Sequence, residues 1–135
     1  MKRLIIDLDH TLCVPQDGAD QGADPAAKYK AALPRRDVIE QVRRYREDGF
    51  AVVIHTSRNM RTYAGDVEAI RANTLPVILD WLAAHDVPFD DVIVGKPWCG
   101  FDGFYIDDRA VRPSEFVAKT YDEIVALMDA ERIAG

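Results

Sequence analysis

Two carboxylates stand one residue apart near the beginning of the chain, in the stretch Ile5-Ile6-Asp7-Leu8-Asp9-His10-Thr11. The apolar residues before them predict a short buried strand, and open α/β sheets bind their ligands at the carboxyl ends of such strands. Two neighbouring carboxylates repel each other unless a cation lies between them or one holds a proton, and either condition points to catalysis. The alternative is a surface turn that follows a buried strand, because Asp is common in turns.

Three later apolar runs also end in polar residues, which are Thr56, Lys96 and the pair Asp107-Asp108. Each run is interpreted as a strand, and in a parallel sheet the carboxyl ends of the strands meet at one edge. Carboxylates at that edge suit Mg²⁺, a hard cation that prefers oxygen ligands. The Thr56 hydroxyl and the Lys96 charge suit the oxygens of a phosphate group, which a carboxylate attacks in line. We therefore expect a phosphoryl-transfer site.

The strands that must position these residues are predicted over 4–7, 50–55, 91–94 and 103–106, with 116–118 as a short edge strand. Helices are predicted over 37–48, over 62–72, from a Thr74 cap onward, and from a capping box at Thr120 and Glu123 to about Arg132. Strands that alternate with helices predict an α/β fold with right-handed crossovers. We expect a three-layer, Rossmann-like parallel sheet with helices on both faces.

The segment between the first strand and the first long helix has no periodic pattern. Residues 17–25 are acidic and rich in Gly, which is typical of a loop. Because this loop, about residues 13–33, directly follows the two carboxylates, we interpret it as a flap beside the site, with a tolerated surface insertion as the alternative. No repeat or second domain is visible, so residues 1–135 are expected to form a single domain.

The composition of the chain narrows the class of protein. The net charge of -6 over 135 residues disfavours a general nucleic-acid binder, which usually carries a basic excess. Two cysteines, Cys13 and Cys99, are too few for a disulfide framework and are expected to be free thiols. No apolar run has the length of a membrane span and no secretion signal is visible, so we expect a cytoplasmic protein that does not bind a membrane.

The ordered set of polar strand ends resembles the haloacid dehalogenase (HAD) superfamily of phosphohydrolases. Asp7-Leu8-Asp9-His10-Thr11 matches the first motif of that family, Thr56 the second, Lys96 the third and Asp107-Asp108 the fourth. The resemblance covers nearly the whole chain. His10 departs from the pattern, since many members carry glycine there, and the fourth motif lacks a further downstream acid that some members use.

The resemblance implies a catalytic role for four of the matched residues. Asp7 is the nucleophile that forms an aspartyl-phosphate. Asp9 protonates the leaving oxygen and then activates water for the second step. Thr56 and Lys96 hold the phosphoryl group.

The resemblance also implies a magnesium site. Its ligands are Asp7, Asp107 and the backbone carbonyl of Asp9. Asp108 supports Lys96 or the metal shell, and Thr11 orders the loop that follows the nucleophile.

The substrate class follows from the lengths between motifs and from two further stretches. No insertion is long enough for a large cap domain, so the chain is similar to capless members. Thr56-Ser57-Arg58-Asn59 and Gly95-Lys96-Pro97-Trp98-Cys99-Gly100 look like stretches of small bacterial phosphatases associated with capsule and surface-polysaccharide synthesis. The resemblance implies a sugar phosphate as substrate, contacted by Thr11, Ser57, Arg58 and Asn59. An open site and the apolar loop at Trp98 favour a homo-oligomer.

Arg58 has two interpretations at this point. It lies just past the phosphate threonine, where a guanidinium suits a second anionic group or sugar hydroxyls. The alternative is an ion pair at the surface. Three other functions also stay open for the chain as a whole: a phosphatase of nucleic-acid ends or phosphoproteins, a phospho-receiver module without turnover, and a catalytically silent partner subunit.

Overall fold

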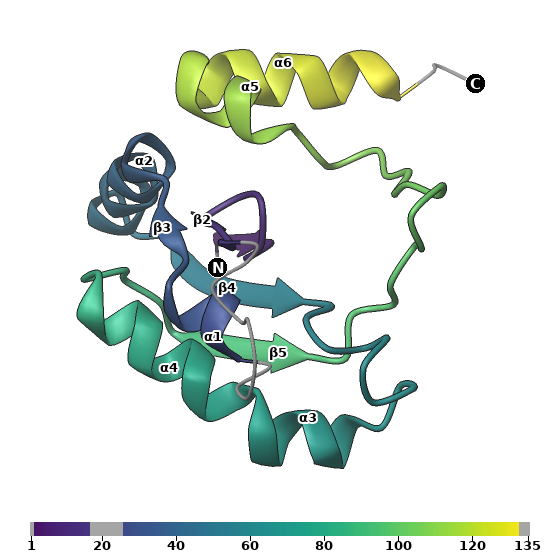
Figure 1. Ribbon diagram of the computed structural model, residues 1–135. Helices are drawn as coiled ribbons and strands as arrows, with labels where there is room; N and C mark the ends of the chain where they lie inside the picture. The colour runs from purple at the N-terminus through teal and green to yellow at the C-terminus, as the bar shows by residue number, and fades with distance from the viewer. Residues whose placement is uncertain (1, 17–25, 133–135) are drawn as a thin grey trace. The chain divides into compact units, whose positions relative to one another are not determined.

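A computed structural model describes residues 2–16 and 26–132 of the chain (Figure 1). The chain divides into two compact units, Met1–Trp98 and Cys99–Gly135. Each unit is described by itself.

The first unit is built on a parallel three-stranded sheet in the order β1-β4-β5, formed by β1 (Arg3–Ile6), β4 (Ala51–Thr56) and β5 (Asp91–Val94). The predicted strands at these three places are confirmed. Ile6 pairs with Ile54 and Thr56 pairs with Val94, so the three strands end at the same edge. The polar residues that follow the strands are therefore delivered to one edge, as the strand pattern predicts.

Three helices pack beside this sheet, and they are α2 (Arg36–Glu47), α3 (Val67–Asn73) and α4 (Leu75–Ala84). α2 buries Val38, Ile39, Val42 and Tyr45, whose spacing predicted the helix, and Gly49 with φ +92° follows its end. The helix predicted over 62–72 begins later, at Val67, because the side chain of Asp66 caps it by accepting from the backbone N–H of Ala69.

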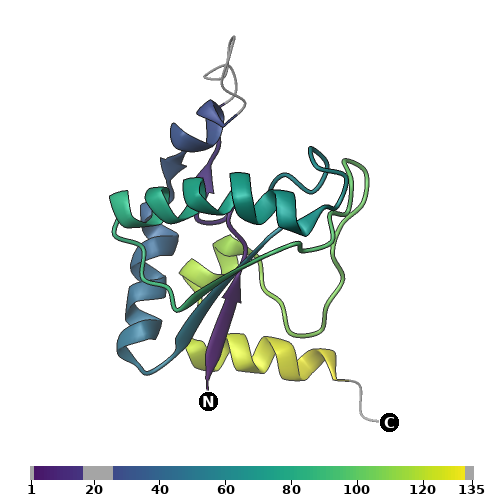
Figure 2. The same ribbon diagram turned by 90° about the horizontal axis from the view of Figure 1, so that it is seen from below.

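The helices of this unit cover one face of the sheet. The chain moves from β1 to β4 to β5 in one direction across the sheet, and right-handed crossovers then place both connections on the same side. Figures 1 and 2 show α3 and α4 running along one side of β4 and β5. Along β4 the side chains of Val52, Ile54 and Thr56 are buried, whereas Ile5 and Ile93 on the other face are exposed.

The predicted flap is anchored at both of its ends. β2 (Cys13–Val14) and β3 (Leu33–Pro34) pair as antiparallel strands, and the short helix α1 (Ala27–Lys30) precedes β3. The tip of the predicted flap, residues 17–25, lies outside the described residues.

The second unit contains two helices, α5 (Pro113–Ala118) and α6 (Tyr121–Glu131). The capping box of α6 is confirmed, since the Thr120 hydroxyl accepts from the Glu123 N–H and the Glu123 carboxylate accepts from the Thr120 N–H. The predicted edge strand over 116–118 is wrong. Pro113 starts a helix there, and the Glu115 carboxylate accepts from the backbone N–H of Arg112 at 2.8 Å.

The predicted strand over 103–106 is also wrong for the described structure. The described residues of the second unit contain no strand over this segment. β propensity expresses how well side chains pack on a pleated, half-buried surface, so apolar composition alone does not make a strand.

The described fold is thus α/β with a parallel sheet, as predicted. None of the helices in the described parts of the chain is long and apolar enough to cross a membrane.

Candidate functional site

The loop after β1 presents Asp7 and Asp9. Leu8, which stands between them, is 1% exposed, and its carbonyl accepts from the N–H groups of Thr11, Leu12 and Cys13 at 2.8–3.3 Å. Since neighbouring side chains in an extended segment point to opposite sides, burial of Leu8 turns both carboxylates away from the core. Leu12, fully buried, fixes the other end of the turn. The loop is therefore held by the core on one side and offers carboxylates on the other.

Asp7 has a cation and a hydroxyl as neighbours. Its Oδ1 lies 3.6 Å from Nζ of Lys96, and its Oδ2 accepts from the Thr11 hydroxyl at 3.2 Å. The side chain of Asp7 is 37% exposed and that of Lys96 is 19% exposed. This half-open ion pair leaves Asp7 accessible from solvent. The Thr11 hydrogen bond joins the loop after β1 to Asp7, and the predicted role of Thr11 in ordering that loop stays a prediction.

Lys96 reaches this position because the chain turns directly after β5. Its backbone N–H donates to the Thr56 carbonyl at 3.1 Å, and Gly95 before it has φ +87°. A Cβ at Gly95 would stand 3.1 Å from a methyl group of Val67, so a side chain there meets both a strained backbone and a close neighbour. The turn joins Lys96 to the end of β4.

Thr56 ends β4 and is buried. Its hydroxyl oxygen accepts from the backbone N–H of Arg58 at 3.1 Å and so shapes the turn that leaves the strand. The hydroxyl hydrogen is not used in that bond. The structure places Thr56 beside Lys96, while its predicted contact with a phosphate stays a prediction.

Arg58 pairs with Asp9 rather than pointing into solvent. Its Nε lies 3.0 Å from Oδ2 of Asp9 and its Nη2 lies 2.7 Å from Oδ1, which is a bidentate pair. The side chain of Arg58 is 1% exposed. The prediction that Arg58 grips a second anionic group on the substrate needs an open side chain, and the alternative of a surface ion pair needs an exposed one. Both are corrected by its burial against Asp9.

Asn59 also has partners within the protein. It adopts φ +63°, accepts from the Thr74 hydroxyl at 2.7 Å and donates to the Thr62 hydroxyl at 3.1 Å. Thr74 was expected to cap α4 with its side chain, but it uses its hydroxyl on Asn59 instead. Asn59 thereby ties the turn after β4 to the start of α4. The predicted substrate contact of half-exposed Ser57 stays a prediction.

His10 occupies a backbone position that favours glycine. Its φ is +63°, and its N–H donates to the Cys13 carbonyl at 2.7 Å. A non-glycine residue in this region costs free energy, and His tolerates it better than β-branched residues do. The tight turn therefore forms with a histidine at this position.

Two titratable groups around this edge are perturbed. Burial raises the pKa of the Cys13 thiol to about 12, with a further contribution from Asp9, whose Oδ1 lies 3.5 Å from Sγ. Burial lowers the pKa of His55 below 6.5, and the charge of Lys96 lowers it further. Sequence reasoning treated Cys13 only as a free thiol, and no local signal places it beside Asp9.

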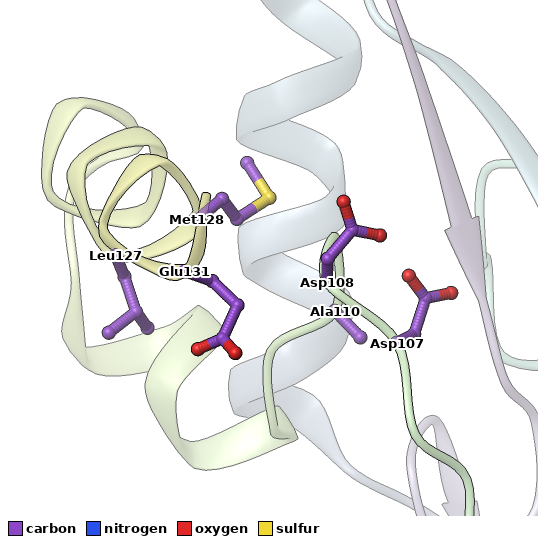
Figure 3. Close-up of a pocket in the computed structure, with 6 residues that line it drawn as sticks. All are labelled: Asp107, Asp108, Ala110, Leu127, Met128 and Glu131. Atoms are coloured by element: carbon purple, nitrogen blue, oxygen red, sulfur yellow. The ribbon is translucent and has the colours of Figure 1, made fainter. Parts of the chain in front are cut away.

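The second unit carries Asp107 and Asp108 in the segment before α5. The backbone N–H of Arg109, 2.9 Å from Oδ1, lowers the pKa of the Asp107 carboxyl below 3.8. Figure 3 shows both carboxylates at a shallow pocket within this unit, lined by Asp107, Asp108, Ala110, Leu127, Met128 and Glu131. Asp107 therefore remains a predicted, exposed oxygen ligand.

The fold and the geometry of the first unit define an α/β protein whose parallel sheet carries a cluster of carboxylates and cations at its carboxyl edge. The chain is similar over its whole length to a crystal structure of an MCSG structural-genomics target from Vibrio cholerae, with 54% sequence identity and a TM-score of 0.86. That similarity covers 98% of this chain and 100% of the other. The chain belongs to the family of this Vibrio cholerae protein. No protein-family model and no curated protein matches it.

Proposed function

We propose that the protein is a Mg²⁺-dependent phosphomonoester hydrolase of the HAD type, without a large cap domain, that acts through an aspartyl-phosphate. The observation that carries this proposal is the half-open Asp7–Lys96 pair at 3.6 Å, with Asp9 two residues away in the same anchored loop. Asp7 offers a nucleophile, and Lys96 offers the positive charge that phosphate oxygens need during transfer.

In the first step, Oδ of Asp7 attacks the phosphorus and the bond from phosphorus to the ester oxygen breaks. The electron pair of that bond stays on the leaving oxygen, which takes a proton from the carboxyl group of Asp9. The products are an alcohol and the phosphorylated Asp7. Asp9 suits this role because its side chain, 21% exposed, is open to a bound substrate.

In the second step, the carboxylate of Asp9 takes a proton from water as the water oxygen bonds to phosphorus. The bond between phosphorus and Asp7 breaks, and its electron pair restores the Asp7 carboxylate. Inorganic phosphate leaves, so one ester and one water give one alcohol and one phosphate. The Thr56 hydroxyl hydrogen and Lys96 are proposed to bind the transferred group in both steps.

The residues of the loop after β1 fit a hard cation. Asp7 and the Asp9 carbonyl offer oxygen donors close together in sequence, and Asp107 is proposed as a further carboxylate ligand, with Asp108 supporting the metal shell or Lys96. When bound, Mg²⁺ neutralises negative charge on the phosphoryl group.

We infer further that the substrate is a phosphorylated small molecule, such as a sugar phosphate of polysaccharide synthesis, handled in the cytoplasm. The accessibility of Asp7 and the resemblance to capless phosphatases support a small, open site. The helices of the first unit cover one face of its sheet, and the three-layer arrangement with helices on both faces stays a proposal, as does a homo-oligomer. The net charge of -6 disfavours the ends of nucleic acids as the substrate.

The test is a panel of phosphorylated metabolites, with nitrophenyl phosphate as a generic substrate, assayed in Mg²⁺ for phosphate release. Asp7→Asn should abolish turnover, because an amide oxygen does not form the acyl phosphate. Asp48→Asn, at an exposed position after α2, is the matched control and should keep wild-type activity. Unchanged turnover in Asp7→Asn would sink the mechanism, and a stable phospho-adduct without turnover would favour a receiver module.

A further inference from the structure

The Arg58–Asp9 pair joins a buried residue to an accessible one. Asp9 has a side chain that is 21% exposed, whereas the side chain of Arg58 is 1% exposed. Two hydrogen bonds, at 3.0 and 2.7 Å, connect the guanidinium to the two oxygens of the carboxylate. Arg58 is therefore in contact with a group that a ligand reaches, although a ligand does not reach Arg58 itself.

The guanidinium of Arg58 has three close neighbours, which are the Tyr29 ring, the Cys13 thiol and the Asp9 carboxylate. The ring of Tyr29, in α1, lies over it with its centroid 4.2 Å from Cζ, which is cation–π distance. Sγ of Cys13 lies 3.8 Å from Nη2 and 3.5 Å from Oδ1 of Asp9. Nη1 is buried and has no hydrogen-bond partner among the described residues. A buried cation with one unsatisfied nitrogen is costly, so its remaining contacts, above all Asp9, must hold it in place.

We propose that Arg58 is a positioning residue that fixes the plane of the Asp9 carboxylate for proton transfer, an inference that rests on the proposed function. A planar guanidinium that binds both oxygens sets the rotation of the carboxylate about its bond, which a lysine point charge does not. Oδ1 of Asp9 accepts from both Nη2 of Arg58 and the Cys13 thiol, whereas Oδ2 accepts from Nε of Arg58 and keeps a second lone-pair direction, which the proposed proton transfer uses. Arg58 acts through Asp9 and touches no reacting atom.

This role has a chemical signature that a merely structural role lacks. An ester with a poor leaving group needs a proton on the departing oxygen, whereas a dinitrophenolate departs without one. Loss of Arg58 should therefore slow the reaction of phenyl phosphate far more than that of dinitrophenyl phosphate. With the activated ester, transfer to Asp7 proceeds and the hydrolysis that needs Asp9 becomes slow, so the phosphorylated protein accumulates.

The experiment measures kcat/KM for both esters in the full-length chain with Mg²⁺. For Arg58→Met we expect a loss of roughly 100-fold with phenyl phosphate, within the usual contribution of general acid–base catalysis, and under about 5-fold with dinitrophenyl phosphate. Arg58→Lys should be intermediate. Arg71→Met, which breaks an exposed ion pair with Glu68 in α3, is the matched control and should change neither rate.

A double-mutant cycle with Asp9→Asn isolates the connection. If Arg58 acts through Asp9, Arg58→Met should cause no further loss with phenyl phosphate once Asp9 is Asn. Tyr29→Leu, which removes the ring over the guanidinium, should show the same leaving-group dependence at smaller size. It keeps the test decisive if Arg58→Met does not fold, which thermal unfolding will show.

Two results overturn the inference in different ways. Equal losses on both esters, or additive losses in the cycle, make Arg58 a structural residue while the hydrolase proposal stands. A wild-type protein that hydrolyses neither ester removes the proposed function and this inference together.

Discussion

Leu8 is the residue on which the geometry of the carboxylates depends. Its side chain is 1% exposed and lies between Asp7 and Asp9 in sequence, and its carbonyl anchors the turn that follows. Leu8→Ala removes the buried part of the side chain and leaves the carbonyl in place. Truncation of a fully buried leucine costs about 2–5 kcal/mol, and for a site this closed we expect about 3 kcal/mol.

Under the proposed function, Leu8→Ala should lower kcat in addition to stability. When Leu8 is Ala, the loop is free to settle toward the cavity and shift both carboxylates together. A displacement of about 1 Å at a catalytic group lowers the rate on the order of 100-fold. We therefore expect kcat to fall by that order in protein that is still folded at the assay temperature.

Urea unfolding followed by tryptophan fluorescence measures the stability change, because Trp81 is buried in α4 of the same unit. Leu79→Ala makes the same chemical change at a position in α4 that is 39% exposed, and it should cost under about 1 kcal/mol. If Leu8→Ala costs no more than this control, or if it keeps wild-type kcat, Leu8 does not hold the loop.

Two titrations test the electrostatics of the same edge. Burial raises the pKa of Cys13 to about 12. A thiol reagent at pH 8 should therefore modify only Cys99 in the native protein and both cysteines in urea. Rapid modification of two thiols in the native protein would contradict the burial of Cys13. The pKa of His55 is lowered below 6.5 by burial and by Lys96, so the neutral imidazole is favoured in the folded state. The stability it contributes is fully present above pH 6.5 and is lost as pH falls through the lower folded pKa; an NMR midpoint above 6.5 for His55 refutes this.

The sequence predicted best what depends on short-range patterns. Strand ends follow from apolar runs and their polar stops, and this was enough to bring Asp7, Thr56 and Lys96 to one edge of the sheet. The capping box at Thr120 was predicted for the same reason, since its two hydrogen bonds join residues three positions apart. Such features carry their partners within the local sequence.

The errors concern residues whose conformation is decided by distant partners. Arg58 was assigned to the substrate because nothing in its neighbourhood shows that Asp9, 49 residues earlier, binds it. Thr74 was assigned to its own helix, although Asn59 takes its hydroxyl. The apolar run over 103–106 has strand-like composition, but composition does not supply the neighbouring strand that pairing requires.

The described structure shows which positive charges compensate the carboxylates of Asp7 and Asp9. Two carboxylates so close need a shared cation or a proton, yet the described structure gives each its own cation, Lys96 for Asp7 and Arg58 for Asp9. The two cations differ in how firmly the protein holds them. The Lys96 ammonium is a point charge on a flexible stem in a half-open pair, whereas the buried guanidinium fork of Arg58 holds one orientation. In the proposed mechanism, the nucleophile Asp7 therefore pairs with a point charge that also binds the phosphoryl group, and the acid–base residue Asp9 is held in one orientation. The double exchange Lys96→Arg and Arg58→Lys should therefore lower kcat. The loss should be larger than the change in the number of hydrogen bonds alone accounts for.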